Sequence, residues 1–381
     1  MIYLDYAATT PVSNEAIDSY IKASKDYFGN PSSLHDTGSH SLQLLEMCRS
    51  ELSRLLNGDQ DGFYFTGSGS EANVLALLSL MEAHKHKGNH IITSHGEHSS
   101  VRHFFQRMEN KGFEITYLPT DETGRVRILD LEAAVKSTTI LVSIQFVNAE
   151  IGTIQPIGEI GELLDQRGVI FHCDAVQAFG KMDINIHQLK IDSLSVSSHK
   201  IYGPKGVGAA YIAPKVKWIP TIPSTTHEKG FRPGTVNVPG IAAFIAAAES
   251  VYTKMAQENQ RISSLRAEMV DLLTALPVPI YIEGSSDHCL AHILGFRIGG
   301  MEGQYAMLEC NRHGVAISTG SACQSGNQEP SSTLLALGRS NLEAKQLIRL
   351  SFGEHTTRND IHTAAEVFKM LTEEYFSAIR R

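Results

Sequence analysis

The chain has 381 residues, of which 42% are hydrophobic and 19% are charged, so it has enough material for one large domain or two. Its formal net charge of −8 does not favour a broad nucleic-acid-binding surface. Met1–Asp5 lacks the basic region and apolar core of a signal peptide, and no apolar run reaches the roughly 18 residues of a membrane span. We therefore expect a cytoplasmic protein without a membrane partner.

The segment from about residue 60 to residue 213 alternates short apolar runs with helical patterns. The runs are rich in Val, Ile and Phe with little polar alternation, which is typical of strands covered on both faces. This alternation predicts an α/β fold with a mostly parallel sheet between helices. The expected strands are Phe63–Phe65, His90–Thr93, Glu114–Leu118, Thr139–Phe146, Val169–Cys173 and Asp192–Val196, and the expected helices are Glu71–Ala83, Ser99–Asn110, Leu129–Val135 and Ile157–Gln166.

The pattern changes after a long helical stretch, which we expect from about Pro239 to Leu276. The elements that follow predict a small α+β domain. We expect a large α/β domain over residues 15–255, and a small domain formed by residues 1–14 and 256–381 that carries a loop at about 319–332. The expected strands of the small domain are His292–Ile298, Val315–Ser318 and Leu347–Phe352, and its helices are Gly303–Arg312 and Arg358–Ile379.

The five cysteines are widely spaced and include no Cys-x-x-Cys pair, which disfavours both a disulfide framework and a zinc site. We expect most of them to be buried small hydrophobic residues. Cys323 differs, because the polar, glycine-rich sequence around it offers no core for a thiol. A thiol there could reach a substrate if a neighbouring base or cation supported the thiolate. An incidental exposed cysteine is the alternative.

Lys200 is placed for chemistry rather than packing. It follows Ser197 and His199, and it lies between the apolar run Ile191–Val196 and a Gly/Pro loop. Its amine could form a Schiff base with an aldehyde cofactor, while Ser197 and His199 bind the cofactor phosphate. Pyridoxal phosphate (PLP) requires this combination, together with an acidic partner for its ring nitrogen. A solvated surface lysine is the alternative.

A second candidate for phosphate binding is the segment Thr66–Asn73, which follows a predicted strand and opens a helix. Gly69 allows close backbone approach, Ser70 can donate, and the helix N-terminus offers free N–H groups to an anion. The spacing matches neither a Walker loop nor a dinucleotide fingerprint. A plain capped turn is the alternative.

An acidic partner for a cofactor ring is available at the end of the predicted strand Val169–Cys173. Ligands of open α/β sheets bind at the carboxyl ends of the strands, and Asp174 stands at such an end. Its carboxylate could hold a protonated pyridine nitrogen, while Gln177 could bond the phenolic oxygen. A helix-capping aspartate is the alternative.

Two further residues could act on a substrate. His98 follows a predicted strand and could stack on an aromatic cofactor and carry protons. A structural histidine is one alternative, and a metal site is another, although the histidines nearby match no strong ligand spacing. Arg349 lies in an apolar strand, where its charge needs a partner. A substrate carboxylate is one such partner, and a structural ion pair is the alternative.

A set of short motifs is spread over nearly the full length of the chain. They are Tyr3–Pro11, Gly29–Ser33, Gly69–Glu71, Glu97-His98, Asp174-x-x-Gln177, His199–Gly206, Arg232-x-Gly234-Thr235 and Gly320–Cys323. In this order the set resembles cysteine desulfurases of the NifS/IscS type, which are PLP enzymes of fold type I. The Gly-Ser-Ala-Cys motif resembles the class with an extended, mobile cysteine loop rather than the SufS class.

The resemblance implies how PLP would be held. Lys200 would carry the cofactor and later move the substrate Cα proton, and His98 would stack on the ring and assist proton transfer. Asp174 would pair with the ring nitrogen and Gln177 with the phenolic oxygen. The phosphate would be bound by Gly69, Ser70, Ser197 and His199, and by Thr235 from a neighbouring subunit of an obligate homodimer with shared active sites.

The resemblance also implies the reaction. Arg349 would bind the carboxylate of L-cysteine, with Asn148 as a further substrate contact, and the Cys323 thiolate would attack the substrate sulfur. The products are L-alanine and a Cys323 persulfide. The sulfur would pass to an acceptor protein, either a scaffold or a dedicated client, for iron–sulfur cluster assembly or for thiolation of a cofactor or tRNA. No metal ligand is implied.

One position departs from the family pattern. The family usually has Asn-Asn-Glu-Ile-Gly, and this chain has Ala149 at the second Asn. The loss of one hydrogen bond predicts a working but slower enzyme. An aminotransferase or β-lyase, which would need Lys200 and Asp174 but not Cys323, stays an alternative, and so does a non-catalytic sulfur carrier.

Overall fold

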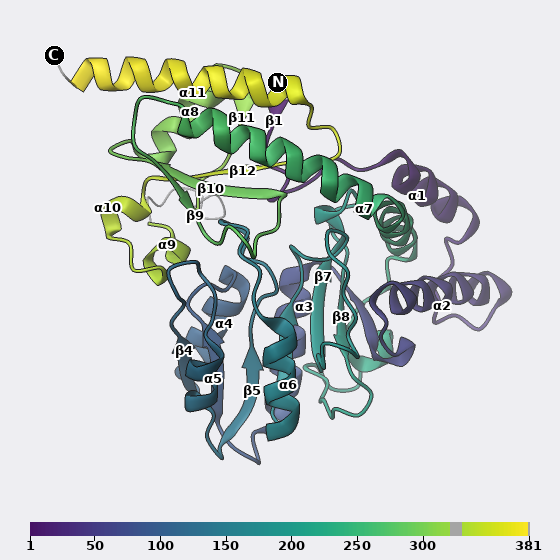
Figure 1. The fold of residues 1–381 in the computed structure, drawn as a ribbon. Helices are drawn as coiled ribbons and strands as arrows, with labels where there is room; N and C mark the ends of the chain where they lie inside the picture. The colour runs from purple at the N-terminus through teal and green to yellow at the C-terminus, as the bar shows by residue number, and fades with distance from the viewer. Residues whose placement is uncertain (321–329, 380–381) are drawn as a thin grey trace.

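The computed structural model describes residues 1–320 and 330–379 (Figure 1). Cys323 therefore lies outside the described residues. Within the described part, the strands form a large sheet, a three-stranded sheet and a two-stranded sheet. In that part no helix is both long and apolar enough to cross a membrane.

The large sheet has the strand order β2-β8-β7-β6-β5-β3-β4 in the described chain. Neighbours from β7 to β4 are parallel, whereas β8 runs antiparallel to both β2 and β7. This mixed, mostly parallel sheet confirms the predicted fold class. Its strands are β2 (Phe63–Thr66), β3 (His90–Ser94), β4 (Glu114–Leu118), β5 (Thr139–Ser143), β6 (Ile170–Asp174), β7 (Ser193–Ser197) and β8 (Gly208–Ile212).

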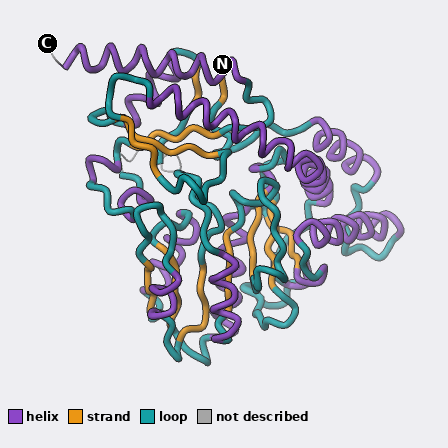
Figure 2. The backbone as a smooth tube through the Cα atoms, in the orientation of Figure 1, coloured by secondary structure: helices purple, strands orange, loops and turns teal. Residues whose placement is uncertain are grey.

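Helices cover both faces of this sheet (Figure 2). Side chains alternate between the two faces: Phe63 and Phe65 join the core beneath α2 and α6, whereas Tyr64 joins the core beneath α3 and α4. Burial on both faces explains why most of these strands are rich in apolar residues. The helices around the sheet are α2 (Asp36–Leu56), α3 (Gly69–His84), α4 (Ser99–Glu109), α5 (Ile128–Ala134) and α6 (Ile157–Arg167).

The sequence analysis did not predict β8. Its Gly-Ala-Ala start has weak strand propensity, and tertiary packing decides its structure. A Cβ atom on Gly208 would lie 2.5 Å from the carbonyl carbon of Ser68, so only glycine lets β8 pass against the start of α3.

The second region is built on the antiparallel sheet β12-β10-β9 and the parallel pair β1-β11. The pairing of Ile2 with Val315 brings the first residues of the chain into this region. Figure 1 shows α11 along its outer side. Its elements are β1 (Ile2–Tyr3), β9 (Ile280–Glu283), β10 (Ile293–Ile298), α8 (Gly303–Arg312), β11 (Val315–Ala316), α9 (Ser332–Ala336), α10 (Asn341–Ala344), β12 (Leu347–Ser351) and α11 (Arg358–Ile379).

The helix α7 (Val238–Thr274) connects the two regions. Phe244, near its start, belongs to the core of the large sheet, whereas Met269, near its end, belongs to the core of the second region. The helix α1 (Asn14–Asp26) packs on α7 through Ala16. One continuous helix thus shares its two ends between two cores, as expected of a linking element. The predicted domain boundaries stay a prediction.

Candidate active site

A cavity of about 410 Å³ lies where β6 and β7 end. Asp174 closes β6 and Ser197 closes β7, while Gly69 opens α3 on the same cavity. Arg349 reaches the cavity from β12, in the other sheet. The two regions therefore both contribute to one site, at the sheet edge where α/β proteins bind ligands.

Lys200 ends a short 3-10 helix, Ser198–Lys200, directly after β7. Its Nζ atom donates to the carbonyl oxygens of Ala7 and Ala8, at 2.6 Å and 2.7 Å. These two carbonyls belong to the N-terminal segment that pairs with the second region. The predicted lysine therefore lies in the cavity, held by backbone acceptors rather than extended into solvent.

Asp174 is held by donors that the sequence analysis missed. Its Oδ2 atom accepts from the Asn73 amide at 2.7 Å, and its Oδ1 atom accepts from the Val176 backbone N–H at 3.0 Å. The Asn73 carbonyl oxygen lies 3.2 Å from Nε2 of His172, whose Nδ1 meets the Ser193 hydroxyl at 2.9 Å. Burial lowers the pKa of His172 to about 3, so this ring is neutral and fixes Asn73 with its amide N–H toward Asp174.

A signal for both missed residues was present in the sequence. Asn73 ends the Thr66–Asn73 segment that was considered for phosphate binding, and His172 precedes Asp174 by two residues, on the same face of β6. Neither residue could be paired with Asp174 without the packing of α3 on β7 and β8, which brings Asn73 within reach of Asp174.

Gly69, Ser70, Ser197 and His199, which are the residues of this subunit predicted to bind phosphate, all line the cavity. A Cβ atom on Gly69 would lie 2.6 Å from Cγ2 of Val176, so the backbone N–H groups at the start of α3 stay accessible only with glycine. The Ser197 hydroxyl is buried and has no hydrogen-bond partner among the described residues. Burial lowers the pKa of His199 to about 4, and its Nδ1 atom lies 3.1 Å from the Thr9 hydroxyl.

This set of residues fits a phosphate group. Buried polar groups normally have partners, so an unpartnered Ser197 hydroxyl beside a helix N-terminus indicates an oxygen-rich ligand. Together with the amine of Lys200 and the carboxylate of Asp174, it supplies the donor set that PLP requires.

Gln177 also lines the cavity, and both ends of its amide are engaged. Its Nε2 atom donates to the Ala7 carbonyl at 3.0 Å, and its Oε1 atom accepts from Lys181 Nζ at 3.2 Å. The amide nitrogen carries a second N–H, which can serve a ligand in the cavity.

His98 stands at the cavity, at the start of α4. Its Nδ1 atom accepts from the Ser100 backbone N–H at 3.2 Å, so the ring proton is on Nε2. Burial lowers the pKa of His98, against the opposing effect of Asp174, so the neutral ring is favoured at neutral pH. Glu97 beside it is buried, and burial raises its pKa to about 8. The neutral His98 ring is therefore suited to stacking on a flat ring, and Glu97 adds no charge beside it at neutral pH.

Arg349 is buried and already has one carboxylate partner. Its Nη2 atom donates to Asp5 at 2.8 Å and its Nη1 atom to the Ala149 carbonyl at 3.0 Å, while its Nε atom has no partner among the described residues. The structural ion pair considered from the sequence therefore exists. It leaves donors of the guanidinium for a second anion, because five N–H groups are present in all.

Two predicted residues do not line this cavity. The Asn148 side chain donates to the carbonyl oxygen of Gly96 and accepts from the backbone N–H groups of Glu150 and Ile151, so it supports the turn that carries Ala149. Thr235 is exposed, as a residue that serves a neighbouring subunit would be. Their predicted roles stay predictions.

A second cavity of about 520 Å³ adjoins the first. His98, Gln145, Ala149 and Arg349 line both cavities, so the two meet at the guanidinium of Arg349. Gly320 lines the second cavity and precedes Cys323 by three residues. Among the described residues, no cluster of three or more His, Cys, Asp or Glu side chains could hold a metal ion.

The fold and this cavity define a PLP-binding enzyme of the α/β class. The Aminotransferase class-V family model matches residues 2–363, and the chain belongs to this family, whose members depend on PLP. The chain is 46% identical over 376 residues to a NifS cysteine desulfurase of Bacillus subtilis (strain 168), covering 98% of this chain and 95% of that protein.

Two other comparisons agree. Cysteine desulfurase IscS of Clostridium botulinum (strain Hall) is 39% identical over 375 residues, covering 98% of this chain and 94% of that protein. A solved NifS-like protein is similar with a TM-score of 0.91 at 28% identity, covering 98% of this chain and 99% of its own. The resemblance inferred from the motifs is confirmed.

Proposed function

We propose that this protein is a PLP-dependent cysteine desulfurase, which converts L-cysteine to L-alanine and leaves the sulfur as a persulfide on Cys323. One cavity carries the proposal. Lys200, Asp174 and the residues proposed to bind phosphate line it from the large sheet, and Arg349 lines it from the second region. The names of the relatives support the substrate and the reaction.

Each residue of the cavity would have a distinct role. PLP supplies an electron sink for the charge that develops at the substrate Cα. Asp174 would hold the proton on the ring nitrogen, Gln177 would donate to the phenolic oxygen, and His98 would cover the ring. The phosphate would be bound by Gly69, Ser70, Ser197 and His199, and by Thr235 of a second subunit in the proposed homodimer.

The substrate would enter from the second cavity. Arg349 would bind its carboxylate through donors that Asp5 does not use, which places Cα toward the Lys200 amine. Lys200 would then remove the Cα proton. Ala149, at the junction of the two cavities, offers no side-chain hydrogen bond to the substrate.

The sulfur transfer balances without an added oxidant. The Cys323 thiolate forms a bond to the substrate sulfur, the C–S bond breaks, and its electron pair stays on Cβ, which takes up a proton to become the methyl group of alanine. The cavity that Gly320 lines supports an approach of Cys323 from this side. The persulfide would then pass to an acceptor protein in iron–sulfur cluster assembly or in thiolation of a cofactor or tRNA.

The test is alanine release from L-cysteine by the purified protein with a thiol reductant. We expect release by the wild type and none by Cys323→Ala. Equal alanine release by both would refute desulfuration through Cys323, whereas a β-lyase would release pyruvate and sulfide in place of alanine. No release by either, with PLP bound, would indicate a non-catalytic sulfur carrier.

A further inference from the structure

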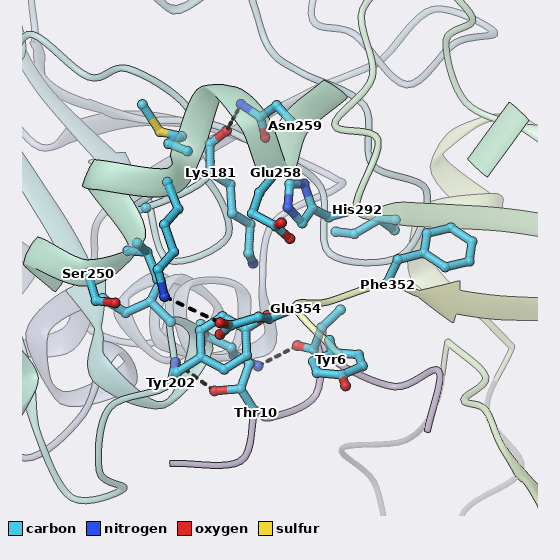
Figure 3. Close-up of a pocket in the computed structure, with 18 residues that line it drawn as sticks. Tyr6, Thr10, Lys181, Tyr202, Ser250, Glu258, Asn259, His292, Phe352 and Glu354 are labelled. Atoms are coloured by element: carbon cyan, nitrogen blue, oxygen red, sulfur yellow. Dashed lines mark hydrogen bonds and ion pairs between the residues drawn. The ribbon is translucent and has the colours of Figure 1, made fainter. Parts of the chain in front are cut away.

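A smaller cavity of about 50 Å³ lies on the other side of Lys200 from the proposed substrate (Figure 3). Figure 3 shows the Lys181 side chain pointing into it, with His292 and Tyr202 nearby. The mechanism uses none of these three residues. A second lysine close to Lys200, and partly buried, needs a reason, because burial of an ammonium group is costly.

A chain of hydrogen bonds links the two lysines. Lys181 Nζ donates to Gln177 Oε1 at 3.2 Å, Gln177 Nε2 donates to the Ala7 carbonyl at 3.0 Å, and Lys200 Nζ donates to the same carbonyl at 2.6 Å. Lys181 itself is fixed from its backbone, because its carbonyl accepts from the Asn259 amide at 3.0 Å. Helix α7 therefore holds the Lys181 backbone, and the contact with Gln177 orients its amine.

The donors in this series of hydrogen bonds determine the orientation of the Gln177 amide. An ammonium group donates and cannot accept, so the amide must turn its oxygen toward Lys181. Its nitrogen then faces Ala7 and the main cavity, where one N–H serves the Ala7 carbonyl and the second is left for a ligand. Without Lys181 only the Ala7 carbonyl would hold this orientation, so the amide would be less firmly fixed and its second N–H a poorer donor to a phenolate.

The surroundings of Lys181 limit its charged, donating form to pH values below its pKa. Burial, with smaller effects of Lys200 and Arg349, lowers the pKa of Lys181 to about 7. Burial lowers the pKa of His292 to about 3, so this ring is neutral. Besides Lys200, the remaining titratable groups of the cavity are Tyr6, Tyr202, Glu258, which pairs with Arg261 at 2.8 Å, and the pair of Glu354 and Lys254 at 3.5 Å.

We propose that Lys181 is a positioning residue, which orients the Gln177 amide so that its free N–H donates to the phenolic oxygen of bound PLP. The inference rests on the proposed function only in that PLP occupies the main cavity. Lys181 touches neither the substrate nor the cofactor, and it acts through Gln177.

The test compares holoenzymes by absorption spectroscopy over pH. A donor to the phenolic oxygen and a nearby cation both stabilise the phenolate, so their loss makes the cofactor bind a proton more readily. In Lys181→Met we expect the midpoint of the cofactor absorbance titration to rise by about 0.4–1 pH unit, as the loss of one hydrogen bond predicts. We also expect the affinity of the apoprotein for PLP to fall by about 2–10-fold.

Three further variants isolate the mechanism. Lys181→Arg keeps a donor and should restore the wild-type midpoint. Lys254→Met removes a lysine from the same cavity that pairs with Glu354, and it should leave the midpoint unchanged. In a Gln177→Ala background, Lys181→Met should move the midpoint little further, because the residue through which it acts is gone.

An unchanged midpoint in Lys181→Met would overturn the inference, and so would an equal shift in the Gln177→Ala background, which would indicate a direct effect of charge. The proposed function is judged separately by alanine release from the wild type. A protein that binds PLP and shows the predicted shift, yet releases no alanine, would refute the desulfurase while the role of Lys181 stands.

Discussion

The two cavities that meet at Arg349 are built differently. In the cofactor cavity, Asp174 accepts from Asn73 of α3 and from the Val176 backbone, and Lys200 donates to two carbonyls of the N-terminal segment. The second cavity is lined instead by turns and by the outer face of α4, where His103 and Gln106 are exposed. The cofactor side is therefore preorganised, whereas the substrate side is open to solvent and completed by residues from several segments.

The largest loss of activity should come from a change of Lys200, in the preorganised cofactor cavity. Replacing Lys200 by Ala removes the proposed base, and general acid–base catalysis contributes about 10²–10⁴-fold to the rate, so we expect alanine release to fall by at least that factor. Lys205→Ala, five residues further on and exposed, is the matched control and should keep full activity. Substantial turnover in Lys200→Ala would place the chemistry elsewhere.

The second-largest effect on activity should come from Arg349, where the cofactor cavity and the second cavity meet. In Arg349→Lys the bidentate donor set is lost, and the KM for cysteine should rise by about 10–100-fold, as expected for hydrogen bonds to a charged group worth about 1.5–3 kcal/mol. Arg297→Lys is the control, because Arg297 is equally buried but pairs with Glu283 away from both cavities. If both variants raised KM alike, the effect would be one of stability rather than of substrate binding.

The hydrogen-bond support of Asp174 can be removed at Asn73, with Asp174 itself left in place. Asn73→Ala removes the donor to Asp174 and the partner of His172, which leaves two buried groups with fewer hydrogen bonds at a cost of about 1–3 kcal/mol. We expect PLP affinity to fall by about tenfold. Asn89→Ala, which removes an exposed amide that bonds the Gly112 carbonyl, should leave the affinity of the apoprotein for PLP unchanged. Unchanged affinity in Asn73→Ala as well would show that Asp174 needs no such support.

The smallest effect on activity should come from a change of Ala149, where the second cavity joins the cofactor cavity. Ala149→Asn restores an amide where the two cavities join, and a gain of about 0.5–1.5 kcal/mol predicts a rise in kcat/KM of about 2–10-fold. Steady-state kinetics with L-cysteine would measure it. Unchanged turnover and KM would mean that this position does not limit the enzyme.

Much of the architecture could be predicted because its cause is local. Strands buried on both faces are apolar runs, so the strands with that pattern were placed within a few residues; Glu114–Leu118 and the helix Gly303–Arg312 have the bounds expected for them. The strand β8 was missed because its Gly and Ala residues have weak propensity and its neighbours decide its structure. The helices α1 and α2 and the strand β9 were also missed.

In the candidate site too, some residues could be predicted from the sequence and others could not. Lys200, Asp174 and Gly69 stand at the ends of elements, so the sequence places them at one edge of the sheet. The partners Asn73, Asp5 and Lys181 could not be inferred, because each contact depends on how separate elements pack. The role proposed for Cys323 depends on the family motif alone.

The most direct test of the central claim is the mass of the peptide that carries Cys323 after the protein has reacted with L-cysteine in the absence of a reductant. We expect this peptide to gain one sulfur atom, in proportion to the alanine released, while the peptide with the half-buried Cys289 stays unmodified. Alanine release with Cys323 unmodified would contradict the account.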